Sequence, residues 1–249
     1  MMSGNQKQDM TLTYPDDCIQ SLIDDWWIPT EKSHIERGRL LLAFVPHVDQ
    51  LPYLLVPKGR NVATEHSLAD CEITPLDVNN LPTRARLPVA GLPCYDGEVR
   101  TVHRAKIRPI LVLALPGPEI PKKYSLNKPK WQTAPSYIVA PYYGVDEGTG
   151  KRAGYSRLFA ERVKHCMYHQ FFWEKLPLSG SNESILRFDH IQPMGGHYKS
   201  YKLTSWKLSP KALNILDDWL QWHFHDNIPE ESDLPSIIEL LQEFEGEQS

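Results

Sequence analysis

The chain has 249 residues, 41% of them hydrophobic and 10% aromatic, which is enough to bury the core of one large domain or of a core domain with additions. No apolar run approaches the roughly 20 residues of a membrane span, and residues 1–10 are polar, so we expect neither a span nor a secretion signal. The four cysteines lie far apart and form no CxxC pair, which favours free thiols and a cytoplasmic protein.

The net charge of −4 conceals two regions of opposite sign. From residue 226 onward there are eight acidic residues and no lysine or arginine, so residues 1–225 carry +4, which is −4 minus −8. Residues 100–130 hold eight cations against one glutamate, a local excess of +7. This excess suits a polyanionic partner, and a solvated basic loop is the simpler alternative.

The first elements are a helix and a strand. Apolar spacing near 3.6 predicts a helix at 13–27, with Thr13 as N-cap. The continuous apolar run at 39–45 ends at Pro46 and predicts a buried strand. Residues 46–105 are rich in proline, and we interpret them as an inserted segment with short β pieces, such as 53–56 and 87–90.

Short apolar runs and helical stripes define the rest of the chain. Strands are expected at 107–115, 136–143, 168–176 and 184–191, and helices at 155–167, 209–224 and 235–245. Residues 116–135, rich in proline and lysine, predict a long surface loop. We therefore expect one domain at 1–225 with an insertion at 46–105, followed by an acidic helical tail at 226–249 that docks on a basic surface of this chain or of a second copy.

The strand at 184–191 carries the most suggestive pair of charges. Arg187 and Asp189 are two residues apart, so an extended strand would place both side chains on one face. A cation beside a carboxylate can bind a phosphate and move a proton, whereas the simple alternative is a surface ion pair. The strand at 107–115 also begins among cations, Lys106 and Arg108, and we expect both strands in one small barrel.

Five short segments occur in an order that resembles the MazF/PemK (Kid-like) toxin family. They are Arg37-Gly38 before an apolar strand, Arg108-Pro109 opening the next, Ile138-Val139-Ala140-Pro141, Arg187-Phe188-Asp189-His190-Ile191, and a final helix from Leu208-Ser209-Pro210. The resemblance covers roughly 37–45 and 106–225. It implies a mainly β fold, an SH3-like small β-barrel, to which this chain adds an N-terminal helix, an inserted segment and C-terminal helices.

The same resemblance implies a function. It predicts a homodimeric toxin that cleaves single-stranded RNA without a metal or other cofactor and that is held in check by a cognate antitoxin, with no role for a membrane. Arg108 would contact the scissile phosphate, and Arg187 and Asp189 would act as general acid and base. His103 lies near a family loop residue. The expected RNA-binding residues are Lys106, Arg104, Tyr143, Lys151, Arg152 and His190.

Two features depart from the family pattern. Tyr143 stands where one branch of the family has a functional threonine, and about 60 residues replace a short loop. A phenol donates the same hydrogen bond but is far bulkier. A second function therefore stays open, namely a non-catalytic SH3-like module that binds nucleic acid or protein in a defence or regulatory system.

The other candidate sites in the sequence are weaker. His165 and His169 are four apart and could offer two zinc ligands on one helical face, but no third ligand is close. His223 and His225 are more simply explained by the negative end of a helix. No Walker A, GxGxxG, HExxH or GxSxG motif occurs in the chain.

Overall fold

The structure is a computed structural model that divides the chain into two compact units. It describes residues 17–31, 33–48, 50–59, 62, 64–65, 68–79, 98–128, 133–145, 154–179 and 183–242. The first unit combines Met1–Ala43 with Arg108–Ser249, and the second is Phe44–Ile107. The expected short strand at 87–90, the start of the expected N-terminal helix, and Lys151 and Arg152 lie outside the described residues.

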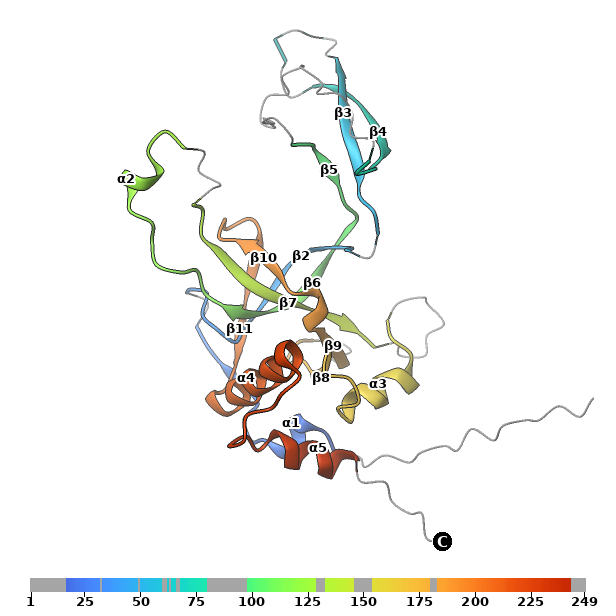
Figure 1. Cartoon of the computed structure of the whole chain (residues 1–249), viewed down its shortest axis with the longest axis vertical. Helices are drawn as coiled ribbons and strands as arrows, with labels where there is room; N and C mark the ends of the chain where they lie inside the picture. Colours follow the sequence, from blue (N-terminus) through green and yellow to red (C-terminus); the bar gives the residue numbers. More distant parts are fainter. Residues whose placement is uncertain are drawn as a thin grey trace, which may run out of the picture. The chain divides into compact units, whose positions relative to one another are not determined.

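The protein is mainly β, and its largest element is a curled antiparallel sheet with the strand order β1-β11-β2-β6-β7-β9-β8. An additional strand, β10, pairs with β7 (Figure 1). The bounds are β1 Trp27–Pro29, β2 Arg39–Pro46, β6 Ala105–Ala114, β7 Ser136–Gly144, β8 Phe171–Lys175, β9 Glu183–Arg187, β10 Gln192–Gly195 and β11 Tyr201–Leu208.

Helix α4, Pro210–His225, covers one face of this sheet and forms the main core with it. Ser209 caps the helix by accepting a hydrogen bond from the Ala212 N–H, and Pro210 occupies the first turn, as the sequence predicts. Leu216 and Trp219 of α4 are buried in one cluster with Leu111 and Leu186 of the sheet. This face of the sheet is called the core face below.

Gly38 allows β2 to pass close beneath α4. Its φ of +74° lies in the left-handed region that glycine adopts without strain. A Cβ at this position would lie only 2.8 Å from Cδ2 of Leu213 in α4. The Arg37-Gly38 pair therefore has a structural reason in this chain, because the Arg37 guanidinium also hydrogen-bonds the Leu113 carbonyl at 2.8 Å and ion-pairs with Asp217 of α4.

Two further helices lie over α4. Helix α1, Ile19–Leu22, is much shorter than the helix expected at 13–27, since β1 begins at Trp27. Helix α5, Leu234–Gln242, confirms the expected helix in the acidic tail. It docks through Leu234 and Leu241, which are buried in the main core, so the surface that receives the tail is apolar rather than basic.

The second unit, Phe44–Ile107, contains a separate three-stranded antiparallel sheet. Its central strand is β3, Tyr53–Gly59, which pairs with β4, Asp70–Pro75, and with β5, Thr101–Val102. This segment covers nearly the same residues as the insertion expected at 46–105. The short strand expected at 53–56 is confirmed as part of β3.

Most of the expected strands are confirmed, and the largest difference is β11, Tyr201–Leu208, which was not expected and lies within the sheet between β1 and β2. The strand expected at 184–191 ends at Arg187, because Phe188–His190 form a 3-10 turn. The strand expected at 168–176 begins only at Phe171. The helix expected at 155–167 is α3, Arg157–Lys164, and the loop 116–135 contains the short helix α2, Lys122–Ser125. None of the helices in the described ranges has the length and apolarity that a membrane span requires.

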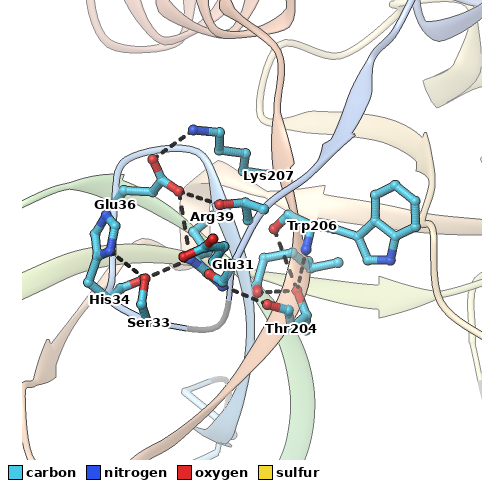
Figure 2. Close-up of polar contacts among 10 residues, drawn as sticks. Glu31, Ser33, His34, Glu36, Arg39, Thr204, Trp206 and Lys207 are labelled. Atoms are coloured by element: carbon cyan, nitrogen blue, oxygen red, sulfur yellow. Dashed lines mark hydrogen bonds and ion pairs between the residues drawn. The ribbon is translucent and has the colours of Figure 1, made fainter.

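A polar network fastens the start of β2 to β11 (Figure 2). The fully buried Arg39 side chain donates hydrogen bonds to the backbone carbonyls of His34, Glu31 and Thr204 at 2.9, 2.5 and 2.8 Å. Glu36 lies 3.6 Å from Arg39 and also accepts a hydrogen bond from Lys207. Burial raises the pKa of Glu36, but the hydrogen bonds from Lys207 and Thr30 outweigh it and lower the pKa below its usual range.

A buried carboxyl group in the core face makes stability depend on pH. Glu174 of β8 is fully buried and accepts a hydrogen bond of 2.6 Å from the Tyr142 hydroxyl. Burial raises the Glu174 pKa to about 8, although the Tyr142 hydrogen bond opposes the shift. Below the unfolded pKa of 4.5 the group is protonated in both states, and between 4.5 and about 8 only the folded state holds the proton.

We therefore expect the Glu174 contribution to stability to fall as pH rises from about 4.5 to about 8. The Glu174→Gln variant should lose this fall and should exceed the wild type in free energy of unfolding at pH 8 by a few kcal/mol, since one pKa unit corresponds to about 1.4 kcal/mol. Urea unfolding between pH 5 and 8.5 measures it, with Glu183→Gln at a partly exposed carboxyl as the matched control. Parallel pH profiles for wild type and Glu174→Gln would contradict the expectation.

Candidate functional site

The pairing register of three strands determines which side chains turn away from the core. Tyr142 of β7 pairs with Leu186 of β9, which pairs with Phe172 of β8, and all three belong to the main core. Side chains alternate along a strand, so the neighbouring residue on each strand must face the opposite way. The sheet therefore has an outer face, opposite the core face, at these three strands.

Tyr143, Arg187 and Phe171 occupy this outer face. Arg187 and Phe171 are direct cross-strand partners, and the Arg187 guanidinium carbon lies 4.9 Å from the centre of the Phe171 ring. Arg108 of β6 joins the same row, because Ile110 pairs with Pro141 and the register continues toward Tyr143. Tyr143 pairs with Ile185, so Arg187 lies diagonally across from Tyr143 on the same face. Four neighbouring strands thus contribute one residue each to a diagonal row of two arginines and two aromatic rings.

Tyr143 lies between the two arginines of this row. The guanidinium carbon of Arg108 is 4.0 Å from the centre of the Tyr143 ring, and that of Arg187 is 5.6 Å from the same centre. Both distances lie within the range of cation–π contacts. Two arginines that the sequence places 79 positions apart therefore border one aromatic ring.

Three extra residues lift Asp189 and His190 out of the sheet beside this row. Tyr142 of β7 pairs with Leu186 and Val139 pairs with Gln192, so β7 advances by three residues while its partner advances by six. The three surplus residues are Phe188–His190, which form the 3-10 turn between β9 and β10. Phe188 fills the core, which leaves Asp189 exposed and His190 half-buried.

Arg187 and Asp189 form a two-point ion pair. Nε of Arg187 donates to Oδ1 of Asp189 at 2.6 Å, and Nη2 donates to Oδ2. The third nitrogen of the guanidinium, Nη1, donates to the Tyr155 hydroxyl at 2.8 Å. The spacing of the two residues predicted this pair on one face of an extended strand. The strand instead ends at Arg187, and the 3-10 turn that follows brings the Asp189 carboxylate back to the guanidinium.

These contacts keep Arg187 charged. Burial lowers the Arg187 pKa, but the hydrogen bonds with Asp189 and Tyr155 outweigh it, and the pKa lies above its usual range. Burial raises the Tyr155 pKa, while the contact with Arg187 opposes this shift. At neutral pH the site therefore presents a permanent cation and a neutral phenol.

Tyr143 has a second polar partner on the 3-10 turn. Its hydroxyl oxygen lies 2.7 Å from Nδ1 of His190, which is a hydrogen-bond distance. The two rings meet edge to face with their centres 5.4 Å apart. The structure thus brings together Arg108, Tyr143, Arg187, Asp189 and His190 of the residues expected at the site.

Three other expected residues belong to a different unit of the chain. His103, Arg104 and Lys106 belong to the second unit and are exposed there. His103 lies 3.2 Å from the Thr101 hydroxyl, and Arg104 donates to Gln50 at 3.3 Å. Tyr155 and Phe171 also contact Arg187, although no sequence motif marks them. Phe171 is its cross-strand partner, and Tyr155 lies just before α3 in an isolated bridge with Val145.

The histidines considered as zinc ligands have other contacts. His165 is buried at the end of α3, with Nδ1 2.6 Å from the Glu161 carbonyl. His169 instead faces His223 of α4, with their Nδ1 atoms 3.2 Å apart. No group of three or more histidine, cysteine or acidic residues suited to a metal ion occurs in the part of the chain that the structure describes.

Comparisons of the chain with models of protein families, with curated proteins and with solved structures found no match.

Proposed function

We propose that the chain is a metal-independent endoribonuclease of the MazF/PemK type, built on an SH3-like barrel, that cleaves single-stranded RNA by attack of a 2′-hydroxyl on the adjacent phosphate. The observation that carries the proposal is the convergence of Arg108 and Arg187 on the Tyr143 ring, with Asp189 bound to Arg187. In such a system the chain acts as a homodimeric toxin that a cognate antitoxin neutralises.

The chemistry requires cations more than it requires an acidic group. When the 2′-oxygen attacks, the phosphorus gains a fifth oxygen neighbour and extra negative charge, which positioned cations stabilise. Arginine suits this role because its planar guanidinium binds phosphate oxygens at two points. With its pKa raised further, Arg187 is a poor proton donor, so its role in this proposal is to bind and stabilise charge.

The test is incubation of the purified full chain with a long single-stranded RNA in EDTA, followed by mapping of the new ends. We expect 2′,3′-cyclic phosphate and 5′-hydroxyl ends, and no cut where the 2′-hydroxyl is replaced by hydrogen. Arg108→Ala should weaken both RNA binding and turnover. Arg157→Ala is the matched control, since Arg157 is an exposed arginine of the same unit that ion-pairs with Glu183.

The outcomes separate the two functions that the sequence left open. Salt-dependent RNA binding that Arg108→Ala weakens, without cleavage by the wild type, would favour the non-catalytic binding module. A wild type that neither binds nor cleaves RNA would refute the proposal. Cleavage that Arg108→Ala leaves unchanged would place the chemistry outside the row of Arg108, Tyr143, Arg187 and Phe171.

A further inference from the structure

The contact between Tyr143 and His190 adds a proton-transfer route to this site. The two residues come from β7 and from the 3-10 turn, and the turn exists only because three extra residues interrupt the pairing with β7. The distance of 2.7 Å from the phenol oxygen to the imidazole Nδ1 is short enough for a proton to pass between them. Tyr143 also borders both arginines, so its hydroxyl belongs to the group that would hold a phosphate.

Asp189 is less well placed to act as the base. Both of its carboxylate oxygens already accept N–H groups of Arg187. A proton arriving at either oxygen would weaken the ion pair that holds Arg187 in place. The geometry is that of a residue that orients the cation, as the carboxylate of a catalytic triad orients its histidine.

We propose that Tyr143 and His190 form a relay that serves as the base for RNA cleavage, with Asp189 as a positioning residue for Arg187. This inference rests on the proposed function. The Tyr143 oxygen takes the proton of the 2′-hydroxyl while the Tyr143 proton passes to Nδ1 of His190. The 2′-oxygen forms its bond to phosphorus, the bond from phosphorus to the 5′-oxygen breaks, and that oxygen takes a proton from water.

The charges around the pair suit this direction of transfer. Arg108 of β6 and Arg187 of β9 favour a phenol oxygen that is losing its proton, because a cation stabilises the negative charge that develops there. The same cations oppose an imidazolium at His190, and the bound phosphate and the adjacent Asp189 offset them. His223 of α4, which packs on Phe188 of the same turn, has its pKa lowered by burial and by His169, so it adds no charge at neutral pH.

The relay makes a prediction that a merely structural contact does not. His190 must be neutral to receive the proton, so cleavage should slow about tenfold per pH unit at acid pH, where the imidazole is charged. Tyr143→Phe keeps the ring beside both arginines and removes only the hydroxyl. It should lower the cleavage rate constant about 10²–10⁴-fold, as expected for loss of a general base, with little change in RNA affinity.

The experiment is the single-turnover rate of RNA cleavage from pH 5 to 9 for the wild type, Tyr143→Phe, His190→Gln and Asp189→Asn, with circular dichroism and thermal unfolding as folding controls. We expect the fall in rate at acid pH in the wild type and in Asp189→Asn, and its loss in His190→Gln together with a slower rate.

Two results would overturn the relay while leaving the nuclease intact. One is cleavage by a folded Tyr143→Phe at a rate within threefold of the wild type, and the other is an acid limb that persists in His190→Gln. If Tyr143→Phe does not fold, the His190→Gln profile decides alone. A wild type that does not cleave RNA refutes the proposed function and the relay with it, which is a different result from a wild type that cleaves without Tyr143.

Discussion

Replacing Arg187 with alanine should lower the rate constant of RNA cleavage by about 10²–10³-fold, the usual cost of removing one group that stabilises charge in a transition state. Arg187 is the cation of the site whose position is most closely determined, because Asp189 and Tyr155 accept three of its five N–H groups, which leaves two for a phosphate. Its loss should cost little stability, because the exposed Asp189 can be hydrated instead. Single-turnover cleavage and thermal unfolding measure the two effects.

The Arg187→Lys variant tests whether cleavage needs only a positive charge at this position or also the contact geometry of the guanidinium. Arg187→Lys keeps the positive charge but cannot make the two-point contact with Asp189 and the contact with Tyr155 together. We expect it to bind RNA nearly as well as the wild type and to recover only a small part of the lost rate. Full activity of Arg187→Lys would show that charge alone matters. Full activity of a folded Arg187→Ala would exclude Arg187 from the chemistry.

The largest effect on stability is expected for Arg39→Met, which should lower the free energy of unfolding by about 3–5 kcal/mol. Methionine is comparable in length and fills the space, but it donates no hydrogen bonds. Three backbone carbonyls that now accept from the Arg39 guanidinium would lose this donor, and the hydrogen bond to the Thr204 carbonyl is the buried one (Figure 2). Each buried carbonyl without a partner costs about 1–3 kcal/mol.

Lys207→Met is the matched control in the same network. Lys207 also ion-pairs with Glu36, but its side chain is partly exposed and bonds no backbone carbonyl in the contacts described. Partly exposed ion pairs contribute about 0–1 kcal/mol, so we expect a small change. Urea unfolding at pH 7 compares the two variants with the wild type. Equal losses for Arg39→Met and Lys207→Met would contradict a special role for the buried guanidinium.

The two arginine predictions differ in kind although both residues lie at strand ends. Arg39 is buried and donates to backbone carbonyls, so its replacement should lower the free energy of unfolding. Arg187 is partly exposed on the outer face, beside aromatic rings and a carboxylate, so its replacement should lower the rate constant of cleavage. A side chain that hydrogen-bonds the backbone stabilises the fold, whereas a partly exposed one among other side chains can contact a ligand.

The sequence by itself determined the elements whose signals are local. The apolar runs at 107–115 and 136–143 became β6 and β7, and the cap at Ser209 with Pro210 began α4. These predictions succeed because burial and capping depend on residues that are neighbours in the chain. Arg187 and Asp189 form an ion pair, but through the 3-10 turn after Arg187 and not on the extended strand that their spacing predicted.

Only the tertiary structure decided what depends on pairing between distant strands. β11 lies between β1 and β2, and its register shift between Leu203 and Lys207 breaks the alternation by which a strand is recognised. Phe171 reaches Arg187 through strand order and register, and Tyr155 reaches it from the segment before α3, which bridges to Val145; no local pattern records either contact. Alternation tells which residues share a face, but it does not tell which strand lies beside which, and the row of Arg108, Tyr143, Arg187 and Phe171 is a property of that order.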